Sequence, residues 1–123
     1  MTTFSDAAWK DMHPAMWMAR VEARILVAEM FDDDLVITSG RRPTSPGGSS
    51  KHQTGEAMDV RSKEWGAASQ RMFADKLRRR LGEDFDVIVE GPAAEDAKYL
   101  TFPDGKPRPP HIHVEWDPKG RHA

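Results

Sequence analysis

The chain contains no cysteine, so neither a disulfide framework nor a cysteine-ligated metal site can form. Any metal ion would have to be bound by histidine, aspartate or glutamate. The chain also lacks a marked excess of either charge, with 18 Lys and Arg against 20 Asp and Glu. This balance argues against nucleic acid as the main partner. A weaker alternative is nucleic-acid binding through the loop 41–51 and the arginines at 78–80.

Long apolar runs are missing as well. The N-terminal stretch "MTTFSDAAWKDM" has no basic start followed by an apolar core, and no segment approaches the length of a membrane span. We therefore expect a protein without a membrane span, synthesised in the cytoplasm without a signal peptide. A length of 123 residues predicts a single domain over residues 1–123, and we expect a monomer.

The spacing of apolar residues predicts an α+β domain. Helices are expected at 14–31, where Trp17, Val21, Ile25 and Ala28 recur at three- and four-residue spacing, and at 66–82. Strands are expected at 35–38, 58–62, 85–90 and 111–116. Together they predict a small antiparallel sheet with about two packed helices. The segments 41–50 and 91–110 are rich in Pro, Gly or Ser and predict surface loops.

Two stretches carry candidate metal ligands. In "HIHVEW", Ile112, Val114 and Trp116 alternate with polar residues, so His113 faces away from the core. In "SKHQTGEAMD", His52 and Asp59 are separated by an odd step, which places them on opposite faces of a regular strand. Gly55 would have to turn or bulge the chain to bring both to one point.

These residues suit zinc. Two imidazoles and one carboxylate, from His52, His113 and Asp59, leave the fourth tetrahedral position open, as hydrolysis requires. The ion would keep a net positive charge, lower the pKa of bound water toward about 7 and polarise a scissile carbonyl. We expect this zinc site on the open face of the sheet.

Hydrolysis also needs a general base. Glu90 ends an apolar strand, where partial burial would raise its pKa, and His111 on the His113 strand is the competing candidate. Glu115 is a candidate for fixing an imidazole tautomer. For substrate binding we expect Arg41 or Arg42 to hold a carboxylate and Ser50 to donate a hydrogen bond.

The three motifs resemble a known family. "SKHQTGEAMD" fits the Ser-x-His-x-x-Gly-x-Ala-x-Asp signature of the M15-type zinc peptidoglycan peptidases, whose fold is shared with D-Ala-D-Ala carboxypeptidases and the hedgehog signalling domain. "TSGRR" resembles their Ser-Gly-x-Arg strand end, and "HIHVEW" resembles their His-x-His strand. The motifs occur in the family's order and cover roughly residues 35 to 116.

The resemblance implies Zn²⁺ held by His52, Asp59 and His113, a substrate-facing Arg42, and cleavage of peptide bonds in the stem peptides of cell-wall peptidoglycan. The small size is similar to that of phage or prophage members, many of them endolysins, which act at the wall after release or as virion components. The bond cleaved is left open between L-Ala-D-Glu endopeptidase, D,D-carboxypeptidase and cross-link endopeptidase activities.

The chain departs from the family at one position. Many members carry a catalytic glutamate three residues before the last histidine ligand, where this chain has Pro110. Either Glu90 from the neighbouring strand or His111 would then be the base. The alternative is a non-catalytic zinc-binding domain of a phage structural or tail-associated protein, in which His111 closes the zinc site.

Several other residues are assigned ordinary roles. We expect Trp9, Trp17 and Trp65 to be core or packing residues rather than sugar-binding platforms. His13 and His122 are expected to be solvated or core histidines. Arg78, Arg79 and Arg80 are interpreted as the solvated face of a helix.

Overall fold

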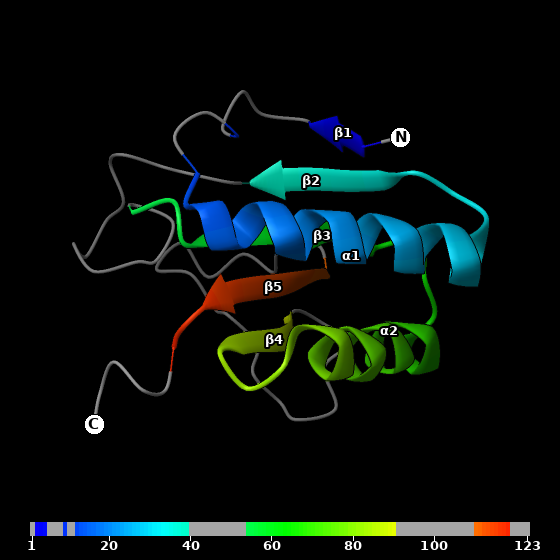
Figure 1. The fold of residues 1–123 in the computed structure, drawn as a ribbon. Helices are drawn as coiled ribbons and strands as arrows, with labels where there is room; N and C mark the ends of the chain where they lie inside the picture. Colours follow the sequence, from blue (N-terminus) through cyan, green and yellow to red (C-terminus); the bar gives the residue numbers. More distant parts are fainter. Residues whose placement is uncertain (1, 5–8, 10–11, 40–53, 91–109, 119–123) are drawn as a thin grey trace, which may run out of the picture.

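The computed structural model describes residues 2–4, 9, 12–39, 54–90 and 110–118. Over these ranges the chain forms two helices and five strands (Figure 1). In chain order they are β1 (Thr2–Phe4), α1 (Pro14–Phe31), β2 (Leu35–Ser39), β3 (Ala57–Arg61), α2 (Ala67–Leu81), β4 (Phe85–Glu90) and β5 (His111–Trp116). The α+β class and the two predicted helices are confirmed. None of the helices in the described part of the chain is long and apolar enough to cross a membrane.

The sheet has the strand order β1-β2-β3-β5-β4. Strands β2, β3, β5 and β4 pair antiparallel, as the sequence predicts. Strand β1 was not predicted and pairs parallel to β2 at the edge, with Thr2 opposite Leu35. Strand β5, which contains "HIHVEW", lies between β3 and β4, so both its neighbours can contribute side chains to one site.

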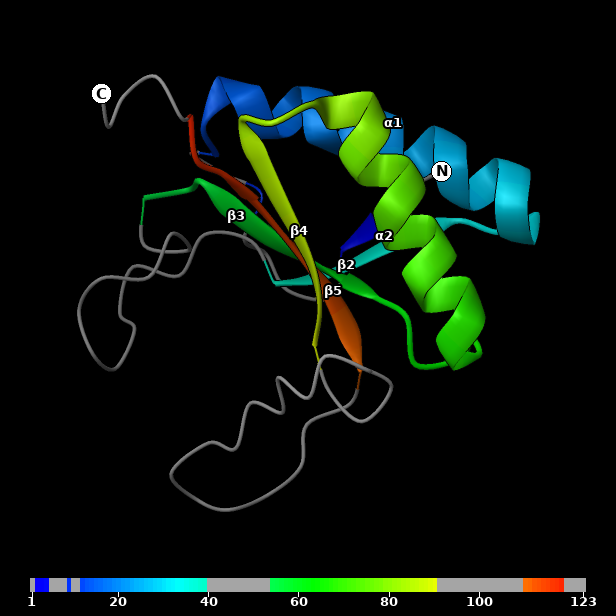
Figure 2. The same cartoon turned by 90° about the horizontal axis from the view of Figure 1, so that it is seen from below.

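Both helices lie on the same side of the sheet (Figure 2). The core between the helices and the sheet is built from buried side chains of both layers, among them Leu26, Ile37, Phe73, Leu77 and Ile112. Burial of large apolar side chains, at roughly 1.5–3 kcal/mol each, is the main favourable contribution to this packing. The opposite face of the sheet carries the alternate residues of β3, β4 and β5, which are mostly polar. We call it the polar face.

The buried face of α1 is not the one that carries Trp17. Its buried residues are Met16, Ala19, Ala23, Leu26 and Val27. Trp17 is 47% exposed, and Val21 and Ile25 share that outer face. Of the two predicted roles for Trp17, core or packing residue, the structure therefore excludes the first: its ring packs on the outer face, in an edge contact with Trp9 and under the Arg20 guanidinium. Trp9 and Trp65 do pack against the core.

Helix α2 follows the expected pattern. Phe73, Leu77 and Leu81 are buried, and Arg78, Arg79 and Arg80 are exposed. The helix ends at Gly82, whose φ of 85° is accessible to glycine without the steric cost that a Cβ imposes. Arg80 then forms ion pairs with Glu22 and Glu29, which join the solvated surfaces of the two helices.

Candidate metal centre

The polar face of the sheet brings the predicted residues of β3, β4 and β5 together. In the antiparallel register Asp59 pairs with His113, and Glu90 pairs with His111. Residues paired across antiparallel strands share a face, so all four side chains lie on the side away from the helices. Ile112 and Val114 between them are buried in the core, which confirms the predicted alternation of β5.

Asp59 and His113 are in direct contact. The Nδ1 atom of His113 lies 3.0 Å from Oδ1 of Asp59, and its Nε2 atom lies 2.9 Å from Oε1 of Glu115. Glu115 thus occupies the position expected of a group that orients the imidazole. Burial alone would lower the pKa of His113. Hydrogen bonds to Asp59 and Glu115 and the charges of Asp59 and Glu90 outweigh it and raise that pKa to about 10.

The distance between the Asp59 and His113 atoms is close to that between two ligands of one zinc ion. Oxygen and nitrogen ligands about 2.0–2.2 Å from a tetrahedral zinc ion lie about 3.3 Å from each other. The 3.0 Å between Asp59 and His113 is slightly shorter, so a small opening of the pair would admit the ion. The donor set of one carboxylate and one imidazole, with Glu115 behind the imidazole, therefore fits zinc.

The two candidate bases also contact each other. Nε2 of His111 lies 2.8 Å from Oε2 of Glu90 and 3.8 Å from Oδ1 of Asp59. Both side chains are more than four-fifths buried. Glu90 reaches this position from β4, where it is paired with His111, the first residue of β5. A proton can therefore pass between Glu90 and His111 beside the carboxylate of Asp59.

Four predicted site residues lie outside the described residues: Arg41, Arg42, Ser50 and His52. The third zinc ligand and the substrate-binding residues thus stay predictions. The chain re-enters the described part at Thr54, and Gly55 follows with a φ of 73°. The chain thus turns at Gly55, as predicted, in a left-handed conformation that glycine adopts at least cost, while the position of His52 stays a prediction.

His13 has a structural role that the sequence did not indicate. Its Nδ1 atom accepts a hydrogen bond from the Ala15 amide at the start of α1, and its ring stacks on Trp116 at 4.0 Å. Its own amide donates to the carbonyl of Gly55 at 2.9 Å. The N-terminus of α1 is thereby joined to the glycine turn and to the end of β5.

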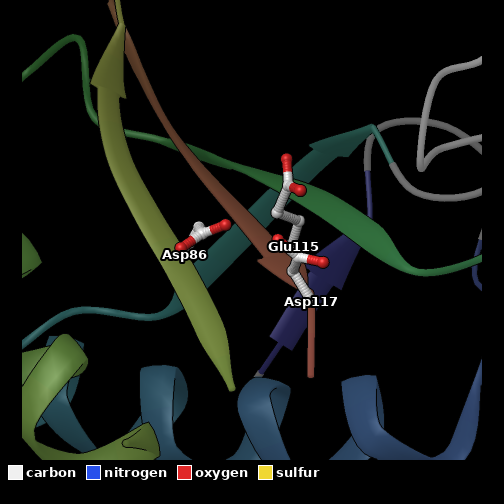
Figure 3. A group of neighbouring side chains, drawn as sticks. All are labelled: Asp86, Glu115 and Asp117. Carbon is white, nitrogen blue, oxygen red and sulfur yellow. The ribbon is translucent and has the colours of Figure 1, made fainter. Parts of the chain in front are cut away.

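A second group of possible ligands was missed by the sequence analysis. The carboxylates of Asp86, Glu115 and Asp117 lie within 4.8 Å of one another and could hold a metal ion (Figure 3). Asp86 pairs with Glu115 across β4 and β5, and Asp117 is two residues further along. The sequence signal for this group is the two-residue spacing of Glu115 and Asp117, which is typical of residues on one face of a strand. An all-oxygen group suits Ca²⁺ or Mg²⁺ better than zinc, and acidic surface groups are common without any ion.

Comparison with models of known protein families and with curated proteins gives no match to this chain.

Proposed function

We propose that the protein is a zinc-dependent peptidase that hydrolyses peptide bonds in the stem peptides of bacterial peptidoglycan. The observation that supports the proposal is the convergence of Asp59 and His113, at 3.0 Å, with the Glu90 and His111 pair on the face of the sheet away from the helices. The substrate class comes from the resemblance of the three motifs to the M15-type peptidases. The expected place of action is the cell wall, after release or as a virion component.

The ligands define the first part of the mechanism. Asp59 and His113, with His52, would hold the ion, and Glu115 would keep His113 oriented through its Nε2 atom. When bound, zinc supplies a lowered pKa for water and polarises the scissile carbonyl. Since the ligand set carries one formal negative charge, the site remains electrophilic.

The Glu90 and His111 pair supplies the proton transfers. As water attacks the carbonyl carbon, the pair accepts the proton that the water loses. The same proton is delivered to the amine nitrogen when the C–N bond breaks, which leaves a carboxylic acid and a free amine. The remaining acid proton then passes to the amine, so that the products are a carboxylate and an ammonium group. The 2.8 Å contact means that either residue can exchange the proton while the other keeps it oriented. The two competing predictions for the base become one functional unit.

Substrate orientation is assigned to the segment between β2 and β3. Arg41 and Arg42 would pair with a carboxylate of the stem peptide, and Ser50 would donate a hydrogen bond. Arginine suits this task because its planar guanidinium binds a carboxylate through two parallel hydrogen bonds.

Mass spectrometry of products released from purified peptidoglycan tests the proposal. We expect soluble peptides with zinc, none after chelation, and about one zinc ion per chain. The masses of the released peptides identify which peptide bond is cleaved.

Substitutions test the individual residues. A His52→Ala protein that still releases peptides would rule out the ligand assignment. Glu90→Gln should lower the rate by about 10² to 10⁴ while retaining zinc, and His111→Asn should do the same. Asp75→Asn, at an exposed ion pair on α2, is the control.

The non-catalytic alternative has one observation in its favour. His111 Nε2 lies 3.8 Å from Asp59 Oδ1, close enough for a modest rotation to make it a fourth ligand. A closed site of this kind would be structural. It predicts bound zinc, a melting temperature that falls on chelation, and no product from any wall preparation. Loss of zinc affinity in His111→Asn would also favour this alternative, since a proton-transfer residue does not bind the ion.

A further inference from the structure

A β-bulge in β2 places Ser39 beside the candidate metal centre. Ile37 pairs with Val60, but the next pair along the two strands is Ser39 with Asp59. Strand β2 thus advances two residues where β3 advances one. In a regular strand residues two apart share a face, so Ser39 would follow Ile37 into the core. The extra residue interrupts this alternation, and Ser39 is paired with Asp59, whose side chain lies on the polar face.

The hydroxyl of Ser39 is buried and makes no hydrogen bond within the described part of the chain. The residue is 8% exposed, and its Oγ atom is out of contact with solvent. A buried hydroxyl without a hydrogen bond is unfavourable, because the hydration lost on folding is not replaced. Such groups are few in folded proteins, and a role in catalysis or in binding an ion is among the reasons that explain them.

The hydroxyl of the neighbouring residue, Thr38, is directed to the backbone of Asp59 rather than to its carboxylate. Thr38 Oγ1 lies 3.5 Å from the main-chain carbonyl of Asp59, on the backbone side. Ser39 is therefore the hydroxyl-bearing residue of β2 that is paired with Asp59 in the register of the two strands. Directly paired residues have Cβ atoms about 4.5–5.5 Å apart. This spacing lets a serine oxygen and a carboxylate oxygen meet after a change of side-chain rotamer.

We propose that Ser39 is a positioning residue for the metal ligand Asp59, and that its hydroxyl donates to the Asp59 carboxylate when the site holds its ion. The inference rests on the metal assignment made under the proposed function. A carboxylate has two oxygens and about four acceptor sites, so it can bind an ion and accept from a hydroxyl together. Ligating carboxylates in proteins are themselves hydrogen-bonded, and that bond fixes their orientation.

The test compares metal affinity with the stability of the metal-free protein. Ser39→Ala should weaken binding of Zn²⁺ and of Co²⁺ by about tenfold or more in competition with a chelator. It should leave the melting temperature of the metal-free protein unchanged or higher, because a hydroxyl without a partner contributes nothing there. Ser39→Thr retains the hydroxyl and should restore most of the affinity. The absorption spectrum of bound Co²⁺ should shift in Ser39→Ala and return toward the wild-type spectrum in Ser39→Thr.

Ser62 provides a matched control. It is buried as well, but its hydroxyl donates to Oε1 of Gln70 at 2.9 Å, between the end of β3 and α2. Ser62→Ala leaves that oxygen without its donor, so the melting temperature of the metal-free protein should fall while metal affinity stays constant. The two alanine variants should thus have opposite effects on stability and affinity.

The outcomes separate this inference from the proposed function. A wild-type protein that binds neither Zn²⁺ nor Co²⁺ overturns both. Metal binding by the wild type with equal affinity in Ser39→Ala overturns the role of Ser39 alone. So does a fall in the melting temperature of metal-free Ser39→Ala as large as that of Ser62→Ala, because it would mark Ser39 as an ordinary structural residue.

Discussion

His113 contacts two carboxylates at once, Asp59 through Nδ1 at 3.0 Å and Glu115 through Nε2 at 2.9 Å. The contact with Asp59 joins the centres of β3 and β5 and brings together two of the three predicted zinc ligands. Because both imidazole nitrogens face carboxylate oxygens, the metal-free protein holds His113 as an imidazolium. This state determines how stability and metal binding should respond to pH.

The stability of the metal-free protein should fall as the pH rises above neutrality. The pKa of His113 is raised in the folded state to about 10, from 6.5. For a group with a raised folded pKa, the stabilising contribution is fully present below pH 6.5 and is lost as the pH rises through 10. We expect a loss on the order of a few kcal/mol across this window, measured by denaturant unfolding with chelator present. His113→Gln should flatten this dependence, and an equally steep slope in that variant would contradict the assignment.

Zinc binding should release a proton from His113. A ligating imidazole must be neutral at the nitrogen that binds the ion, yet near pH 7 the metal-free protein carries the proton. Calorimetry in buffers of different ionisation enthalpy should therefore give a release of about one proton per zinc at about pH 7. Zinc affinity should weaken as the pH is lowered from 10 toward 6.5, because protons then compete with zinc for His113. Binding with no buffer dependence would place the ion away from His113.

The convergence of Asp59, His113, Glu90 and His111 could be anticipated because its signals are local. Strict alternation in "HIHVEW" assigns a face to each residue, and an apolar run ending in Glu90 predicts a neighbouring strand. Gly55 at the odd step between His52 and Asp59 indicates a turn, which its φ of 73° confirms. The pairing of Glu90 with His111 is a matter of register, and register depends on tertiary packing that spacing does not encode.

The features that could not be predicted from the sequence also depend on tertiary packing. Helix α1 is apolar over two overlapping stripes, and spacing alone could not choose between them. The stripe with Ala19 and Ala23 is buried, while the stripe with Trp17 is exposed. Small residues allow the helix to approach the sheet closely. Likewise β1 has only three residues and pairs through tertiary contact, and the bulge that pairs Ser39 with Asp59 has no local signature.

The metal ion has two candidate sites in the described part of the chain. One contains Asp59, and the other is the acidic group formed by Asp86, Glu115 and Asp117. Asp59→Asn should reduce zinc affinity by about 100-fold or more, since an amide is a poor zinc ligand and the pair with His113 loses its charge. The double variant Asp86→Asn, Asp117→Asn should leave zinc affinity and stoichiometry near the wild-type values. Equilibrium dialysis with metal analysis measures both. The reverse result would move the zinc site to the acidic group shown in Figure 3.

Gly55 should be sensitive to substitution in both stability and metal affinity. An added Cβ at a φ of 73° costs roughly 1–2 kcal/mol, and the residue is buried against the start of α1 through the bond from the His13 amide. Gly55→Ala should lower the free energy of unfolding by at least this amount. It should also weaken zinc binding if, as we propose, this turn brings His52 toward Asp59. Gly66→Ala is the control, since Gly66 has a φ of −64° and no atom of the described residues lies within 4 Å of the position that an added Cβ would take. Chemical unfolding with and without zinc, compared between the two variants, separates the stability effect from the effect on the metal. Equal behaviour of the two variants would show that the Gly55 turn does not determine the geometry of the site.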